Sequence, residues 1–237
     1  MVEVINELRI LENGKILCSW KKYISPQVIS DTILSTFQRV NENLYSKFHN
    51  RHQINLEENL LCCENLIHYT WEQLNIGNWK DVQLDWRYFY GYFSLVKAFF
   101  LSFKNPIPCM DILKTCDMGL IMSPSLPNNF LAKFATIIHQ YKIGTCDLEI
   151  NFSKKLKIDL PTIKDENSIE RINFPDITTF EIDYFRKSKP VIIENALNHW
   201  PALDPLSGRR WSLQYLFKTC GFRTVPVEIG SRYTGNF

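Results

Sequence analysis

Histidine and cysteine are the residues of this sequence best suited to metal binding or nucleophilic chemistry. Of the five histidines, His49 and His52 stand three residues apart, so a helix would place both on one face, where they could share a metal ion. No cysteine or carboxylate completes a tetrahedral ligand set around them. Sequence patterns of a Ser-His-Asp triad, a P-loop or a dinucleotide site are absent. These residues predict neither a metal site nor a catalytic residue in this chain.

The cysteines indicate a reducing environment. The seven are Cys18, Cys62, Cys63, Cys109, Cys116, Cys146 and Cys220. Their number is odd, no two form a CxxC pair, and Cys109 and Cys116 do not have the spacing of a zinc site. The first ten residues carry Glu3, Glu7 and Arg9 where a signal peptide needs an apolar run. We therefore expect reduced thiols in a nuclear or cytosolic protein.

The composition excludes several classes of protein. Of 237 residues, 45% are hydrophobic, which excludes a disordered chain, and the net charge of +2 is too small to favour nucleic-acid binding. The aromatic run from Trp86 to Phe93 could stack bases or form a helix core, and the few basic residues nearby favour the core. The most apolar stretch, Tyr88–Phe103, contains Lys97 and is shorter than the ~20 residues that span a bilayer. Neither a nucleic acid nor a membrane is expected as a partner.

Five segments before residue 143 have the apolar spacing of helices. Their expected bounds are residues 26–48, 55–77, 81–100, 109–122 and 128–141. Ser25 and Asn55 are suitable N-caps, and Gly77 is a suitable C-terminal stop. The third segment is aromatic almost all round, which is typical of a helix buried between others. We predict an all-helical domain over residues 1–143, with enough apolar surface to fold alone.

The composition changes after this domain. Residues 144–171 are rich in charge and have little periodicity, so they are expected to form a linker. In residues 172–237 the pattern is mixed: Thr179 and Ser212 are candidate helix caps, and Gly221 would end the second helix. Residues 190–194 and 223–229 have the pattern of strands. A helical domain followed by such a unit predicts an α+β fold class.

Several motifs resemble those of the Jumonji-C (JmjC) oxygenase family. KPVIIENALNHWP, WSLQYL and RTVPVEIGSRYT, at residues 189–201, 211–216 and 223–234, are similar to the opening of its cupin-type domain. WEQLNIGNWKDV and TCDMGLIM, at residues 71–82 and 115–122, resemble the helical N-terminal extension of one branch of the family. The resemblance stays in register through both predicted domains.

This resemblance implies a fold, cofactors and partners. The fold is a cupin-like double-stranded β-helix, of which residues 172–237 would be the first portion. The cofactors are Fe(II) and 2-oxoglutarate, and the substrates are protein side chains, through hydroxylation of arginine or demethylation of methyl-lysine on histones. A chromatin regulator in the nucleus, or also in the cytoplasm, is implied, with protein partners bound through the helical domain.

The sequence departs from the family at the iron site. The family draws its first two iron ligands from an HxD or HxE pair, and no histidine here has an acidic residue two positions on. The iron motif, the distal histidine and the cosubstrate lysine of the family are expected beyond Phe237. We therefore expect a truncated chain that is inactive alone, with no metal ligand and neither cofactor bound tightly. The alternative is a non-catalytic helical protein-interaction module.

Three residues of the predicted barrel portion are site candidates. By resemblance, Tyr233 lies where the family places a tyrosine hydroxyl near the 2-oxoglutarate carboxylate, and the alternative is a strand residue packed against the barrel. Glu194, at the end of the first barrel strand, is a candidate for the substrate groove or a solvated strand-end carboxylate. Arg232 could pair with an acid across the barrel or lie on the surface.

Overall fold

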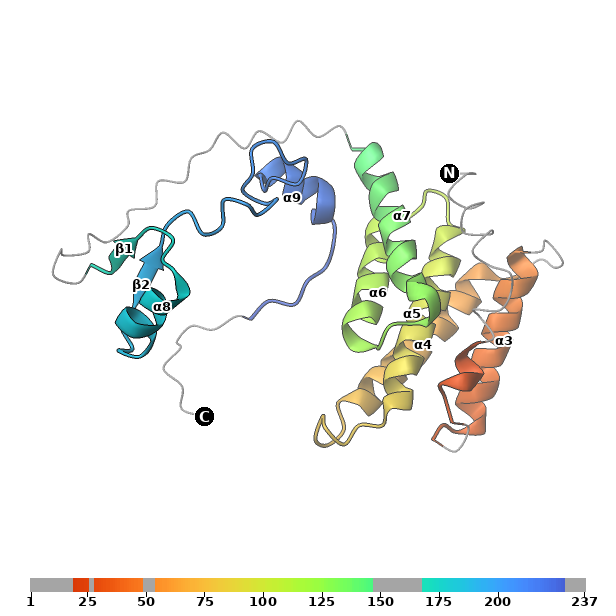
Figure 1. Cartoon of the computed structure of the whole chain (residues 1–237). Coiled ribbons are helices and arrows are strands. Elements are labelled where there is room, and N and C mark those ends of the chain that lie inside the picture. The colour runs from red at the N-terminus through yellow and green to blue at the C-terminus, as the bar shows by residue number, and fades with distance from the viewer. Residues whose placement is uncertain (1–18, 26–27, 49–53, 147–167, 229–237) are drawn as a thin grey trace. The chain divides into compact units, whose positions relative to one another are not determined.

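The computed structural model describes residues 19–25, 28–48, 54–146 and 168–228 (Figure 1). These residues form two compact units. The helical unit comprises the described residues up to Cys146 together with the segment from Phe222 to Glu228, and the second unit comprises residues 168–221. No helix in these ranges is long and apolar enough to cross a membrane. The described structure is mostly helical with a small sheet, which agrees with the predicted α+β class.

The helices of the first unit follow one another in space as they do in sequence. Their bounds are η1 Ser19–Lys22, α3 Asp31–Phe48, α4 Leu56–Leu74, α5 Leu84–Ser102, α6 Cys109–Met122, η2 Pro127–Asn129 and α7 Phe130–Gly144. Helix α5 packs against α3, α4 and α6, and α6 packs against α7 (Figure 1). Asn55 caps α4 by accepting the backbone N–H of Glu58 at 3.2 Å, as predicted. Helix α6 has the predicted bounds.

Helix α5 is buried on almost every side. All residues from Phe89 to Val96 and from Ala98 to Ser102 are buried, which confirms the prediction for the aromatic third segment. The ring of Phe93 packs edge to face on Phe37 of α3, with centroids 4.9 Å apart. Phe99 stacks on Phe134 of α7 at 4.7 Å. Aromatic pairs of this kind add about 0.5–1.5 kcal/mol each beyond the burial of their area.

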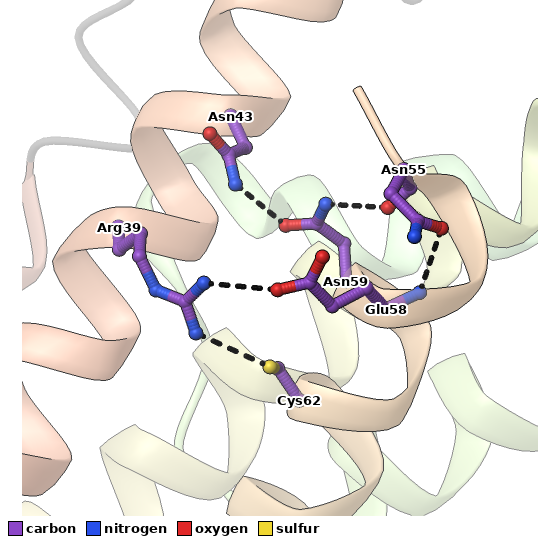
Figure 2. A network of polar contacts seen from close by, with 6 residues as sticks. All are labelled: Arg39, Asn43, Asn55, Glu58, Asn59 and Cys62. Atoms are coloured by element: carbon purple, nitrogen blue, oxygen red, sulfur yellow. Dashed lines mark hydrogen bonds and ion pairs between the residues drawn. The ribbon is translucent and has the colours of Figure 1, made fainter.

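A polar network joins α3 to α4 (Figure 2). The side chain of Asn59 is almost fully buried, accepts a hydrogen bond from Asn43 Nδ2 at 2.9 Å and donates one to the Asn55 carbonyl at 2.7 Å. Arg39 of α3 lies 3.3 Å from Glu58 Oε1. Because a buried amide without partners would be costly, these bonds favour one rotation of α4 against α3.

Two helices begin later than their sequences predict. Helix α3 starts at Asp31, well after the expected cap at Ser25, and α5 starts at Leu84 rather than at Asp81. The backbone N–H of Ser25 donates to Asp85 Oδ1 at 2.5 Å, across 60 residues of sequence. This contact joins the segment before α3 to the first turn of α5, and the local sequence does not predict it.

The second unit contains the sheet. Its elements are β1 Glu170–Ile172, α8 Ile177–Phe180, the π-helical turn η4 Glu181–Phe185, β2 Val191–Ile193 and α9 Leu213–Cys220. The two strands are parallel, with Glu170 opposite Val191. Strand β2 confirms the strand expected over residues 190–194, and Ser212 caps α9 by accepting the Tyr215 N–H at 3.0 Å, as predicted.

Three expectations for this part of the chain are corrected. Strand β1 begins at Glu170, within the segment 144–171 that was expected to be a linker, because β2 supplies a pairing partner that the sequence of β1 does not reveal. Thr179 is not a cap: Asp176 caps α8 and accepts the N–H groups of both Thr178 and Thr179 at 3.0 Å. The strand expected over 223–229 is not formed in its described part, residues 223–228, where no strand lies beside it.

Large apolar side chains of the second unit are mostly exposed. Tyr184 is buried, whereas Ile177 is 84% and Leu206 is 95% exposed. Others that are exposed are Phe174, Phe185, Trp211 and Leu213. The described residues of this unit therefore bury little apolar surface. Burial of apolar surface is the main favourable contribution to the free energy of folding.

We predict that the backbone amides of β1, β2 and α9 exchange hydrogen at least tenfold faster than those of α5. Local opening is easiest where few apolar contacts must be broken. Hydrogen exchange of the 237-residue chain, followed by mass spectrometry, measures this difference. Equal protection of the second unit and of α5 in an isolated monomer would contradict the prediction.

Gly119 allows α6 to lie close to both neighbouring helices. A Cβ at this position would stand 2.7 Å from Leu131 Cδ2 and 2.8 Å from Ser94 Cβ, closer than van der Waals contact permits. We predict that Gly119→Ala destabilises the chain by about 1–3 kcal/mol, the usual cost of overpacking. Urea unfolding followed by circular dichroism gives the value. Gly144→Ala is the control, because its Cβ would meet nothing within 4 Å, and a midpoint shift equal in both variants would refute the packing argument.

Candidate functional site

One polar cluster of the helical unit is centred on Asp117 of α6. The residue is 2% exposed, and its carboxylate accepts three hydrogen bonds from a segment more than 100 residues away. Arg223 donates from Nε at 2.8 Å and from Nη2 at 2.5 Å, both to Oδ1, and the backbone N–H of Thr224 donates to Oδ2 at 2.6 Å. Hydrogen bonds to a charged group contribute about 1.5–3 kcal/mol each, so this cluster holds the segment firmly to α6.

The residue before Arg223 completes the contact on α7. The ring of Phe222 lies 6.0 Å from the imidazole of His139, in an edge-to-face arrangement, and the Lys142 ammonium stands 5.6 Å from its centroid. Phe222 also packs against the apolar core. Three consecutive residues, 222–224, are therefore bound to the helical unit by an aromatic ring, a guanidinium and a backbone N–H.

The buried cysteines of the helical unit are not poised for nucleophilic chemistry. Burial raises the pKa of the Cys63 and Cys116 thiols far above the ordinary value. At Cys116 the neighbouring Asp117 carboxylate raises the pKa further, while Arg223 lowers it. A thiol that stays protonated is a weak nucleophile and a weak metal ligand. The six described cysteines are all free, in agreement with the expectation of reduced thiols.

In the second unit, charged side chains gather around Glu170 of β1. The carboxylate accepts from Lys189 Nζ at 2.6 Å and from the Tyr184 hydroxyl at 3.2 Å. The hydrogen bond from Lys189 lowers the pKa of Glu170 below its ordinary value of 4.5, and Glu170 in turn raises the pKa of Lys189. These bonds link β1 to η4, which contains Tyr184, and to the segment between η4 and β2, which contains Lys189.

The structure describes one of the site residues expected from sequence. Glu194 directly follows β2, where its backbone N–H donates to the Ile172 carbonyl at 2.8 Å. Its exposed carboxylate lies 3.4 Å from Arg171 Nη1. An exposed pair of this kind contributes about 0–1 kcal/mol, so the contact does not decide between a groove residue and a solvated strand end. Tyr233, Arg232, His49 and His52 lie outside the described residues.

The described residues do not fit an iron centre. Within residues 19–25, 28–48, 54–146 and 168–228, no three His, Cys, Asp or Glu side chains come close enough to hold a metal ion. The Glu170 carboxylate is engaged by a lysine and a tyrosine, and the Asp117 carboxylate by an arginine. Cationic partners of this kind compete with a metal ion for the same oxygen atoms.

A polar groove lies between α4, α5 and α6, with a volume of about 540 Å³. Three lysines line it, Lys97 on α5, Lys104 just after α5 and Lys114 on α6. Lys97 lies 3.0 Å from Glu64, and Lys104 lies 3.1 Å from Glu57. Glu64 and Asp111 also line the groove, so its lining carries charges of both signs. Its lysines can bind carboxylate or phosphate groups by charge and hydrogen bonding.

Comparison with known proteins identifies the relatives of this chain. No family model matches it. Lysine-specific demethylase 8 of Danio rerio is 37% identical over 179 residues, covering 71% of this chain and 43% of the relative. Lysine-specific demethylase 8 of Xenopus tropicalis is 26% identical over 223 residues, and Jumonji C domain-containing protein 5 of Drosophila melanogaster is 28% identical over 177 residues. The chain belongs to the JmjC demethylase family.

This membership confirms the resemblance seen in the motifs, and it applies to part of the relatives' length. The chain spans less than half the length of the relatives named here, between 42% and 49%. No solved structure gives a significant match. The cupin fold is suggested by the JmjC relatives, while the part of the chain with described structure contains two strands.

The Asp117 cluster was missed by sequence reasoning. Asp117 and Arg223 each stand inside a motif that resembles the family, TCDMGLIM and RTVPVEIGSRYT, but nothing in either motif pairs them. The available signal was Asp117 itself, an acidic residue on the apolar side of a predicted helix, next to Cys116. A buried carboxylate needs hydrogen-bond donors and an opposite charge, and an arginine elsewhere in the chain can supply both.

We predict that the Glu170 carboxylate titrates below its ordinary pKa. A lowered pKa stabilises the fold at pH values above the ordinary pKa, and that contribution is lost as the pH falls through the lowered one. NMR titration of the Tyr184 ring signals reports it, because the tyrosine hydroxyl donates to this carboxylate. Lys189→Met should return the pKa toward 4.5, and Glu170→Gln should abolish the titration. A parent pKa at or above 4.5 would contradict the ion pair.

Proposed function

We propose that the protein forms part of an Fe(II)- and 2-oxoglutarate-dependent oxygenase that modifies protein side chains in the nucleus. The observation that carries the proposal is the 37% identity to a relative named lysine-specific demethylase 8, over 71% of this chain. The proposed reactions are hydroxylation of arginine and demethylation of methyl-lysine, with histones as the substrate class. Fe(II) and 2-oxoglutarate would supply the oxidising chemistry, and no step of it is assigned to the described residues.

Within this proposal, the chain provides the helical unit and the first portion of a cupin-like domain. Strand β2 and the segment after α9 carry the motifs that resemble the opening of that domain. Exposed apolar side chains such as Ile177, Leu206 and Trp211 support the idea that more of the domain covers the second unit, since large apolar side chains are normally buried. Tyr233 remains the proposed contact to 2-oxoglutarate, and Glu194 a proposed groove residue.

The first experiment compares two preparations. The 237-residue polypeptide, incubated with Fe(II), 2-oxoglutarate and oxygen, should form no succinate with an arginine peptide or a methyl-lysine peptide, because its sequence contains no HxD or HxE pair. Native material captured from cells with an antibody against the helical unit should form succinate with one of the two peptides. Turnover by the polypeptide alone would overturn the ligand argument, and inactive native material would overturn the oxygenase proposal.

A second candidate function is a protein-interaction module in the helical unit. Two observations favour it: the apolar core of residues 20–138 is continuous, and the lysine-lined groove of α4, α5 and α6 is open to solvent. The groove fits a partner with an acidic surface, because Lys114 lies on its exposed rim.

Charge reversal tests the groove. Lys114→Glu should weaken the recovery of an acidic partner from nuclear extract at least fivefold, as judged by quantitative mass spectrometry against the parent chain. Lys133→Glu is the matched control, because Lys133 is an exposed lysine on α7 that does not line the groove. Equal losses in both variants would indicate a general charge effect and would refute a specific groove.

A further inference from the structure

The segment Phe222–Thr224 behaves as a bound ligand of the helical unit. It has no helix or strand of its own, and its contacts are to α6 and α7. Arg223 keeps 23% of its side chain exposed, while the Asp117 side chain is 3% exposed, so the carboxylate is the buried partner and the arginine enters from the surface. Departure of the segment would leave a buried carboxylate without three donors, which strongly disfavours the open state.

The geometry is selective for arginine. Nε and Nη2 of Arg223 both reach Oδ1, an approach that a planar guanidinium permits and a lysine ammonium cannot reproduce. The third bond comes from the backbone N–H of the next residue, so proline is excluded there. The residue before the arginine needs an aromatic face, because Lys142 and His139 contact the ring of Phe222.

We propose that the face formed by Asp117, His139 and Lys142 is a receptor for a short aromatic–Arg–Xaa segment, where Xaa is not proline. Its occupant is the chain's own Phe222–Thr224. The described segment that follows, residues 225–228, thereby starts from a fixed point on the helical unit. Asp117 is the positioning residue of this receptor. The proposal does not depend on the oxygenase function, because every contact that supports it lies within the helical unit.

Hydrogen exchange of the Thr224 amide tests the contact within the chain. In the parent chain this amide, bonded to Asp117 Oδ2, should exchange at least tenfold more slowly than an unbonded amide. Asp117→Asn and Arg223→Gln should each speed the exchange at least fivefold. Asp111→Asn is the matched control on the same helix, because Asp111 is exposed, and it should leave the rate unchanged.

Arg223→Gln keeps the test decisive if Asp117→Asn fails to fold, because Arg223 lies outside every helix. The Thr224 rate would overturn the proposal if it were the same in the parent chain, Asp117→Asn and Arg223→Gln.

Binding of a separate peptide tests the receptor directly. The peptide Gly-Phe-Arg-Thr-Val-Pro has the sequence of residues 221–226. Labelled with a fluorophore, it should bind the Arg223→Gln chain saturably at millimolar concentration, and the same peptide with lysine for arginine should bind at least tenfold more weakly. The double variant Asp117→Asn, Arg223→Gln should not bind it. Absence of saturable binding, or equal binding of the lysine peptide, would overturn the receptor.

Discussion

The burial of α5 on nearly all sides is the constraint on which the helical unit depends. A helix that is apolar all round must be covered by neighbours, and α3, α4 and α6 each cover one part of it. Phe37, Phe93 and Phe99 fill the spaces between α5 and its neighbours with interlocking rings. Gly119 then removes the side chain that would keep α6 away from Ser94. The polar contacts of the unit are built around this packing.

Much of the helical unit could be predicted from sequence, because local rules decide it. The aromatic pattern around Phe93 indicated a buried helix, and Asn55 indicated where α4 begins. The tertiary contact between Ser25 and Asp85 could not be predicted, because the two residues are 60 positions apart and lie outside any local window. The same holds for β1: three residues become a strand only because β2 lies beside them.

The site was less predictable than the fold. Glu194 was identified as a strand-end carboxylate and lies there, but its partner Arg171 belongs to a strand that was not expected. Asp117 was passed over because its partners lie more than 100 residues away, and no spacing rule connects such distant positions. The motifs that resemble the JmjC family identified the relatives correctly. The family motifs thus contained Asp117 and Arg223 but did not indicate that these two residues contact each other.

The contact between Asp117 and Arg223 also changes how the intervening polypeptide is held. The chain leaves the helical unit after α7 and is bound to it again at Phe222, so the intervening residues connect two fixed points of that unit. The entropy of closing a loop grows only with the logarithm of its length, at about 0.6 kcal/mol per doubling. Insertions or deletions of many residues between these two points would therefore change the cost of closure very little. The attachment point can stay constant while the intervening segment grows or shrinks.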